Sequence, residues 1–155
     1  MKYINGDLIR LAKEGKFDVI GHGCNCFHSF GAGFAKAVKE EFPEAYMADK
    51  RSRYGDRGKL GTFTKYDYDT QIFSPNALTI LNLYTQFKYT STEVDVEYGA
   101  LRRCMKAVKK TYSGKIIGFP LIGAGLAGGD WNIISQIIDD ELGDEDVTIV
   151  KYRKL

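Results

Sequence analysis

The sequence predicts an α/β fold in which a mixed central sheet carries helices on both faces. Stretches rich in apolar, aromatic and β-branched residues alternate along the chain with stretches that have the apolar spacing of amphipathic helices. Interleaved strands and helices of this kind build a sheet that is covered on both sides. Two of the predicted strands also run into glycine-rich loops that lead into helices. We expect one domain that spans residues 1–155.

Six stretches are predicted to form strands. They are residues 2–5, 17–22, 62–68, 78–84, 115–119 and 147–152. The first stops at Gly6, the third alternates and is rich in aromatic residues and Thr, and the fourth is expected to lie at the centre of the sheet. A turn at residues 74–77, which contains Pro75, separates the third and fourth strands.

Five stretches are predicted to form helices. They are residues 8–12, 34–42, 44–53, 94–111 and 131–142. Phe34, Val38 and Phe42 recur on one face of the second helix, and Pro43 suits the first turn of the third. Residues 86–92 are polar and aromatic and are predicted to form a loop at the end of the central strand.

The two glycine-rich loops are the features that bear most directly on function. Four of the eight residues from Ile122 to Gly129 are glycine, and the loop after the second strand carries Gly31-Ala32-Gly33. Glycine lets backbone N–H groups approach a ligand without a Cβ in the way, and the positive end of a following helix favours an anion. We therefore expect two backbone cradles facing one elongated anionic ligand, such as a nucleotide diphosphate sugar. The alternative is that both loops are tight connectors.

Two well-known nucleotide motifs are missing from these loops. The chain has no Gly-Lys-Ser/Thr of a P-loop and no Gly-x-Gly-x-x-Gly followed by an acidic residue, as a Rossmann site requires. A dinucleotide-dependent redox enzyme is therefore disfavoured.

The composition limits the classes of partner. Hydrophobic residues make up 44% of the chain and the net charge is +2, which argues against a broad nucleic-acid surface. A local basic patch remains an alternative to the simpler interpretation of the same residues as a solvated helix end. Its members are Lys50, Arg51, Arg53, Arg57 and Lys59.

The chain shows no sign of membrane insertion or of a disulfide framework. No apolar run approaches the roughly 20 residues that span a bilayer, and the N-terminus lacks the apolar core of a signal peptide. Cys24, Cys26 and Cys104 are odd in number, which favours a reducing compartment. We expect a cytoplasmic monomer that does not associate with membranes.

Alternate positions near the first glycine loop raise the question of zinc. They are occupied by His22, Cys24, Cys26 and His28. Tetrahedral sites usually need wider, turn-forming spacings, so we expect no metal. We expect instead that Cys24 is a small buried apolar residue and that His22 lies at the end of a strand. His28 is either a general acid or base beside Asn25 or an ordinary loop histidine.

Four short motifs, in this order along the chain, carry a family resemblance. They are Gly6-Asp7-Leu8, Asn25, Gly31-Ala32-Gly33 and Ile122-Gly123-Ala124-Gly125-Leu126. With these motifs the chain resembles, over nearly its whole length, the macrodomain family of ADP-ribose-binding α/β modules. The Cys-Asn-Cys loop and the Gly-Leu-x-x-x-x-Trp ending of the second loop look most like one branch. That branch includes ADP-ribose-1″-phosphate phosphatases and ADP-ribose glutamate hydrolases.

The resemblance implies a role for each matched position. Asp7 would accept a hydrogen bond from the adenine amino group, unless it serves as a helix N-cap, and Leu8 would supply backbone contacts. Asn25 would face the distal ribose, whose hydroxyl pair needs both a donor and an acceptor. The two backbone cradles would hold the ligand with Gly31, Ala32, Gly33, Ile122, Gly123, Ala124, Gly125, Leu126 and Ala127.

Two departures from the related enzymes bear on catalysis. Where the glutamate hydrolases have a lysine and an aspartate, this chain has Gln86 and Ala127, so a lysine-adduct mechanism is not expected. The resemblance implies hydrolysis of an ADP-ribose derivative at C1″, with ADP-ribose-1″-phosphate as the expected substrate. The expected catalytic residues are Asn25, His28 and Asp130.

Two alternatives to the phosphatase remain. One is an enzyme that removes ADP-ribose from a protein carboxylate or from nucleic acid, and the other is a protein that binds ADP-ribose without turnover. An ADP-ribosylated protein or nucleic acid is therefore a possible partner, and no cofactor is expected.

Overall fold

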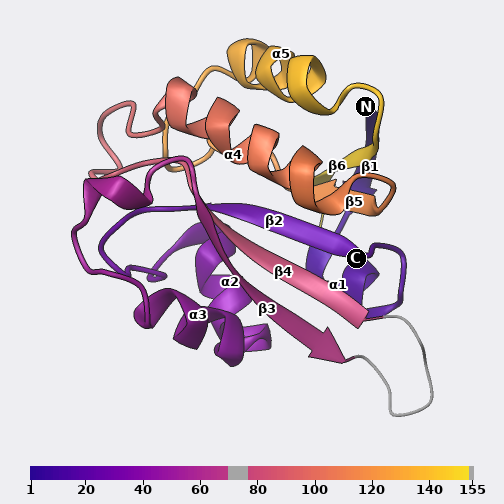
Figure 1. Cartoon of the computed structure of the whole chain (residues 1–155), viewed down its shortest axis with the longest axis horizontal. Coiled ribbons are helices and arrows are strands. Elements are labelled where there is room, and N and C mark those ends of the chain that lie inside the picture. Colours follow the sequence, from indigo (N-terminus) through magenta and orange to yellow (C-terminus); the bar gives the residue numbers. More distant parts are fainter. Residues whose placement is uncertain (70–76, 154–155) are drawn as a thin grey trace.

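The computed structural model describes residues 1–69 and 77–153 (Figure 1). The strands are β1 (Lys2–Gly6), β2 (Val19–Cys24), β3 (Phe63–Asp69), β4 (Ala77–Tyr84), β5 (Ile116–Phe119) and β6 (Asp146–Tyr152). The helices are α1 (Leu8–Lys13), α2 (Gly33–Glu41), α3 (Pro43–Lys50), the short 3₁₀ helix η1 (Arg57–Lys59), α4 (Tyr98–Tyr112) and α5 (Trp131–Leu142). Within these ranges no helix is both long enough and apolar enough to cross a membrane.

The strands form one mixed six-stranded sheet in the order β1-β6-β5-β2-β4-β3. Strand β3 pairs antiparallel with β4, and every other pairing in the sheet is parallel. The predicted mixed α/β fold is therefore confirmed. Because parallel strands point the same way, the carboxyl ends of β1, β6, β5, β2 and β4 meet at one edge of the sheet.

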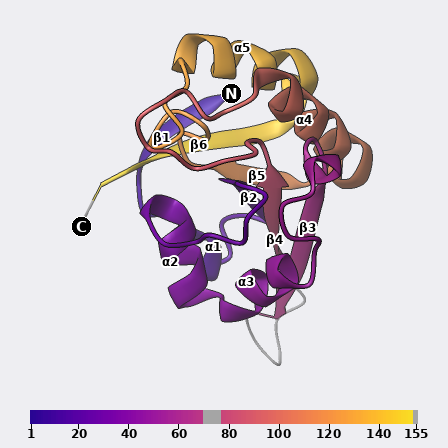
Figure 2. The ribbon, with the colours of Figure 1, turned by 90° about the vertical axis from the view of Figure 1, so that its left-hand side faces the viewer.

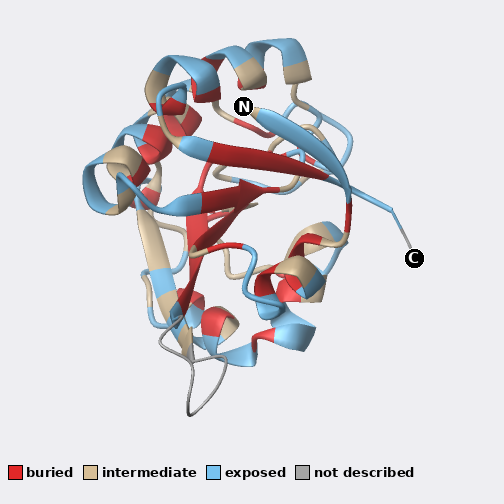
Figure 3. Ribbon diagram, turned by 90° about the vertical axis from the view of Figure 1, so that its right-hand side faces the viewer, coloured by how far each residue is buried: buried red, intermediate tan, exposed pale blue. Residues whose placement is uncertain are grey.

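Helices cover both faces of this sheet. Helices α4 and α5 lie on one face, and α1, α2 and α3 lie on the other (Figures 1 and 2). Side chains of β2 alternate between the two layers, so Val19 packs under α4 and α5 while Ile20 packs under α1 to α3. The central strands are buried, whereas the outer surfaces of the helices are exposed (Figure 3).

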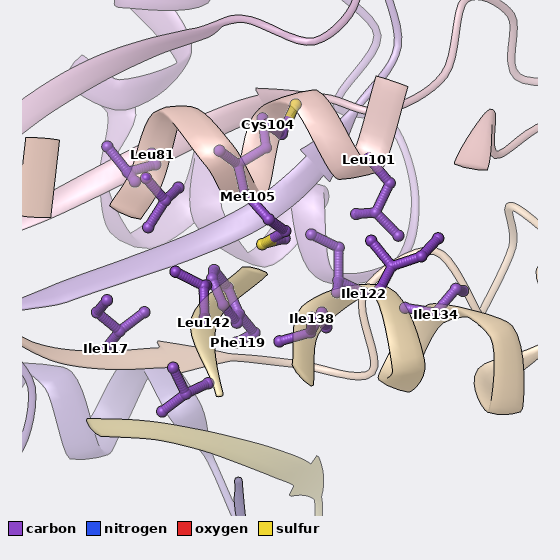
Figure 4. Close-up of a cluster of buried hydrophobic side chains, with 14 of the residues drawn as sticks. Leu81, Leu101, Cys104, Met105, Ile117, Phe119, Ile122, Ile134, Ile138 and Leu142 are labelled. Carbon is purple, nitrogen blue, oxygen red and sulfur yellow. The ribbon is translucent and has the colours of Figure 1, made fainter. Parts of the chain in front are cut away.

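Each layer has its own core of fully buried side chains. Leu101, Met105 and Val108 follow each other on the inner face of α4, where they meet Phe119 of β5 and Ile134 of α5 (Figure 4). Each such side chain contributes about 1.5–3 kcal/mol through its removal from water. This packing fixes β2 and β5 rigidly and therefore fixes the loops that follow them.

The predicted elements are found, with two corrections. The fourth strand, β4, lies second from the edge of the sheet and not at its centre, and one helix begins later than predicted. Residues 131–142 form α5 as predicted, but the long helix begins at Tyr98 and not at residue 94. The amides of Asp95 and Val96 donate to the carbonyl of Ala127 at 2.8 and 3.2 Å, which holds this segment extended. A helical spacing of apolar residues cannot reveal such a long-range backbone bond. The turn predicted at residues 74–77 falls largely on 74–76, outside the described residues.

Candidate functional site

The topology places a cleft at the carboxyl ends of β2 and β5. These two strands are neighbours, but the chain leaves β2 towards α2 on one face and leaves β5 towards α5 on the opposite face (Figures 1 and 2). Connections that diverge in this way open a crevice at the strand ends, which is where ligands bind in open α/β sheets. The cleft has a volume of about 670 Å³.

Two glycine loops and a third segment line the cleft. The third segment follows β4 and contributes Gln86, Tyr89, Ser91 and Asp95. Of the positions predicted from the sequence, nearly all of both cradles line it. They are Asn25, Gly31, Ala32, Gly33, Ile122, Gly123, Gly125, Leu126 and Ala127.

The loop after β5 is folded so that part of its backbone is left open to the cleft. Gly123 has a φ of 77°, a conformation that favours glycine, and its carbonyl accepts the amide of Gly129 at 2.8 Å. Among the described residues, the amides of Gly125, Leu126 and Ala127 donate no hydrogen bond within the protein. Three successive uncommitted N–H groups can bind an anion.

The loop after β2 ends in an open helix N-terminus. Ala32 is the N-cap of α2 and has no side chain that could satisfy the first amides of the helix. Residues 31–35 line the cleft, so the positive end of α2 faces it. Helix α5 differs, because the carboxylate of Asp130 accepts the amide of Asn132 at 2.8 Å. The open helix end at the cleft is therefore that of α2.

The side chain of Asn25 holds the first loop together. Its Oδ1 accepts the amides of Phe27 at 2.9 Å and Ser29 at 3.4 Å, and its Nδ2 donates to the carbonyl of Ser29 at 2.9 Å. A carboxamide has two N–H donors, so one remains for a ligand in the cleft.

His22 lines the cleft from the end of β2 and is only 1% exposed. Its Nε2 lies 2.8 Å from Oδ1 of Asn82, whose Nδ2 donates to the carbonyl of Ala45 and to the Thr64 hydroxyl. Because Asn82 therefore accepts, we assign the proton to Nε2, which leaves Nδ1, 3.8 Å from Sγ of Cys24, as an acceptor. Burial lowers the pKa of His22 to about 4, so the ring is neutral at neutral pH.

Asp95 organises the third wall of the cleft. Its carboxylate accepts the amide of Thr90 at 2.5 Å, the Thr90 hydroxyl at 2.9 Å and the amide of Ser91 at 3.3 Å. Its own amide donates to Ala127 in the second glycine loop. The carboxylate of Asp95 therefore fixes the loop that carries Tyr89, and the backbone amide of the same residue joins two walls of the cleft.

Comparisons with known proteins agree with this architecture. No protein-family model matches the chain. The chain is 38% identical over 160 residues to an uncharacterized 17.5 kDa protein of Enterobacteria phage T4, which covers all of this chain and 98% of the phage protein. It is 28% identical to an ADP-ribose 1″-phosphate phosphatase of Lodderomyces elongisporus over 90% of this chain and 91% of the yeast protein.

Solved structures with the same fold include named macrodomains. The macrodomain of Thermus aquaticus DarG has a TM-score of 0.71 and 21% identity, and the match covers 99% of this chain and 97% of that one. Thermosipho africanus DarTG in complex with ADP-ribose has a TM-score of 0.75 and 17% identity, over 99% of this chain and 41% of that one. The chain has the macrodomain fold.

Two of the predicted binding residues lie beside β1, outside the cleft lining. The Oδ1 atom of Asp7 accepts the amide of Arg10 at 3.2 Å, so Asp7 is the N-cap of α1, while its Oδ2 makes no hydrogen bond with another described residue. Leu8 is buried in the core between α1 and the sheet. Asp7 nevertheless follows a strand that ends at the same sheet edge as the cleft.

The structure does not bring the other two predicted catalytic side chains into the cleft lining. His28 has its Nε2 3.0 Å from the carbonyl of Ser52, behind the first loop. Asp130 caps α5, and Ala124, the remaining predicted cradle residue, packs against the core. By contrast, His22 and Asp95 line the cleft, although His22 was expected only to end a strand and Asp95 was not predicted as a site residue.

Backbone and neutral groups dominate the described lining of the cleft. It contains no lysine or arginine, and it includes Gln86 and Ala127. Lys88 is exposed and pairs with Glu93 at 2.6 Å. Among the described residues, no group of three or more His, Cys, Asp or Glu side chains is arranged to hold a metal ion.

Proposed function

We propose that the cleft binds ADP-ribose and that the protein releases the phosphate of ADP-ribose 1″-phosphate by hydrolysis. The observation that carries the proposal is that two sets of open backbone amides, at the start of α2 and at Gly125 to Ala127, line one cleft. Such a pair suits a diphosphate without any cationic side chain. The activity in the name of the yeast relative and the ligand in the Thermosipho complex support the same ligand class.

The ends of the ligand would be held by different residues. Asp7 has an uncommitted carboxylate oxygen beside the end of β1, which suits the amino group of adenine. Tyr152, the register partner of Gly6, is exposed and offers an aromatic face at the same end of β1. At the other end, the remaining N–H of Asn25 would donate to a hydroxyl of the distal ribose.

Hydrolysis needs a water placed in line with the phosphorus and a group that accepts its proton. His28 and Asp130 are committed to other contacts, so we assign the acceptor to Nδ1 of His22. The attacking water would form a new phosphorus–oxygen bond while the bond from phosphorus to the ribose oxygen breaks. The ribose oxygen would take up a proton, which yields ADP-ribose and phosphate. A buried, neutral imidazole held by Asn82 is already in the unprotonated form that this step requires.

A protein that binds ADP-ribose without turnover is the second candidate. It is favoured by one observation, the presence of Gln86 and Ala127 in the lining where related hydrolases have ionisable residues. The cleft would then bind the ligand with the same backbone amides and carry out no chemistry.

A turnover panel separates these functions. The protein would be incubated with ADP-ribose 1″-phosphate, with a glutamate-linked ADP-ribosyl peptide and with thymidine-linked ADP-ribose, and products would be resolved by chromatography. We expect phosphate release from the first substrate, and loss of this activity in His22→Gln with ADP-ribose binding retained. If the protein binds ADP-ribose but turns over none of the three substrates, it is a binding protein without catalytic activity. If it turns over only a linked substrate, it is a de-ADP-ribosylating enzyme.

A further inference from the structure

An aromatic cluster forms the rim of the cleft beside Asn25. Phe27 lies at its centre, with ring centroids 5.4 Å from Tyr54, 4.8 Å from Phe87 and 6.4 Å from Tyr89. We call these four residues the aromatic rim. Tyr54 is 70% exposed and Tyr89 is 53% exposed, and Tyr89 also lines the cleft. Large aromatic side chains gathered on a surface next to a binding cleft indicate an interaction site.

The aromatic rim is held in place by backbone hydrogen bonds between three segments. The amide of Gly55 donates to the carbonyl of Cys26 at 2.7 Å, and the amide of Cys26 donates to the carbonyl of Phe87 at 3.0 Å. Gly55 has a φ of 68°, and a Cβ at this position would lie 3.3 Å from the Phe27 ring. The rings are therefore presented in a fixed arrangement and lose little freedom when a partner stacks on them.

Cationic side chains border the aromatic rim. Arg53 directly precedes Tyr54 in the chain and Arg51 lies two residues earlier. Lys59, which was also predicted to belong to the basic patch, is only 7% exposed and lies over the Tyr84 ring. Arg51 and Arg53 are exposed and, among the described residues, have no ion-pair partner. Arg57 stacks on the Phe87 ring at 4.5 Å.

Two of the nearby carboxylates are engaged by other cations, Glu93 by Lys88 and Glu97 by Arg57. Asp56 accepts the amide of Gly58 and forms no ion pair with a described residue. The guanidinium groups of Arg51 and Arg53 therefore remain available to an anionic partner.

We propose that the aromatic rim binds unpaired bases of a single-stranded nucleic acid and that Arg51 and Arg53 contact its phosphates. Exposed aromatic faces beside cations are the features that bind single strands, because every base can stack on a ring and every nucleotide carries a charge. Base pairing hides the base faces, so a duplex fits less well. Tyr89 belongs to both the aromatic rim and the cleft lining, so a bound strand would lie next to the cleft.

The test uses an unmodified deoxythymidine decamer with a fluorescent label, measured by anisotropy in low-salt buffer. Wild-type protein should bind the decamer, and Tyr54→Ala and Tyr89→Ala should each weaken binding by about tenfold. Tyr54→Phe should bind like wild type, because the stacking face is kept. The matched control is Tyr3→Ala, another exposed tyrosine that lies on β1 and should leave decamer affinity unchanged. Arg53→Gln should reduce the dependence of binding on salt, by about 0.7 in the log–log slope for each phosphate that the variant no longer neutralises.

Three outcomes would overturn the proposal. They are no decamer binding by a protein that still binds ADP-ribose, equal decamer affinity of Tyr54→Ala and wild type, and displacement of the decamer by a glutamate decapeptide at equal concentration. The last would assign the rim to an acidic protein partner. Binding of the decamer with no binding of ADP-ribose would instead contradict the proposed function of the cleft, so the two failures are distinct.

Discussion

Nε2 of His22 lies 2.8 Å from Oδ1 of Asn82 inside the sheet, where the two residues are register partners on β2 and β4. Asn82 cannot rotate to offer its amide group instead, because Nδ2 is bound to the carbonyl of Ala45 and to Thr64. The pairing thus fixes the orientation and the tautomer of a histidine that lines the cleft.

This relationship predicts how stability depends on pH. In the unfolded chain His22 titrates near 6.5, and in the fold its pKa is lowered to about 4, chiefly by burial. Above pH 6.5 His22 is neutral in both the folded and the unfolded state, so its protonation takes nothing from the free energy of unfolding. Between pH 6.5 and 4 the unfolded state gains a proton that the folded state does not, so the free energy of unfolding should fall by about 3 kcal/mol. Urea unfolding at a series of pH values measures this change.

His22→Gln supplies the control for that experiment. Carboxylates also titrate in the lower part of the range, but they do so in both proteins. Between pH 6.5 and 4 the variant should therefore lose less stability than wild type, and the difference should be nearly all of the fall that we attribute to His22. Identical pH profiles for the two proteins would contradict a buried, neutral His22.

The second prediction concerns the glycine loop after β5. A Cβ built on Gly125 has open space around it, so a side chain there enters the cleft without a clash in the protein. Gly125→Glu should weaken ADP-ribose binding by at least about tenfold, or 1.4 kcal/mol, because it brings a negative charge to the diphosphate. Gly125→Gln has the same size and no charge and should weaken binding less. Calorimetric titration that finds equal affinity for Gly125→Glu and wild type would remove this loop from the site.

The sequence predicted the elements and both loops because their signals are local. Glycine in strand–helix turns, the period of α5 and the alternation of β3 are all visible within a few residues. The start of α4 was predicted wrongly because the hydrogen bonds of Asp95 and Val96 to Ala127 join positions about thirty residues apart. Such a bond leaves no trace in a helical pattern.

The lining of the cleft could be predicted from the sequence where the glycine-loop backbone forms it, and less so where side chains form it. Gly31, Gly33 and Gly125 line the cleft because any chain with this topology turns there. His28 and Asp130 were predicted as catalytic because they lie close in sequence to the two loops. In the structure His28 contacts the carbonyl of Ser52, and Asp130 caps α5. The position of His22, at the end of an apolar strand and three residues before Asn25, was the signal that could have identified it.

The third prediction tests whether Asp7 reads the adenine base. Asparagine caps helices as well as aspartate does, so Asp7→Asn should change stability by less than about 0.5 kcal/mol. Its NH₂ group would meet the adenine amine donor to donor, and the preference for ADP-ribose over inosine diphosphate ribose should disappear. Asp56→Asn, which alters the cap of η1, should leave both affinities unchanged. A persistent adenine preference in Asp7→Asn would show that another residue reads the base.

The fourth prediction concerns the loop held by Asp95. In Asp95→Ala both acceptor oxygens are lost, so none of the bonds from Thr90 and Ser91 can form. We expect amide hydrogen exchange in residues 90–93 to become faster and the free energy of unfolding to fall by about 2 kcal/mol. Exchange in α5 is the internal reference, since Asp95 does not contact it through these bonds. Unchanged protection of residues 90–93 would mean that other contacts order the loop.

The last prediction compares Asn25 with the two cysteines that flank it. Burial raises the pKa of Cys24 and of Cys26, so both thiols are protonated and poor nucleophiles. Neither cysteine is in the cleft lining, whereas Asn25 is, and a distal ribose held slightly out of line costs about a hundredfold in rate. Asn25→Ala should therefore lower kcat on ADP-ribose 1″-phosphate by about a hundredfold, while Cys24→Ser and Cys26→Ser stay within about threefold of wild type. Melting temperatures check that the first loop survives the loss of the Asn25 hydrogen bonds. An inactive serine variant beside an active Asn25→Ala would replace this account with covalent catalysis by a thiolate.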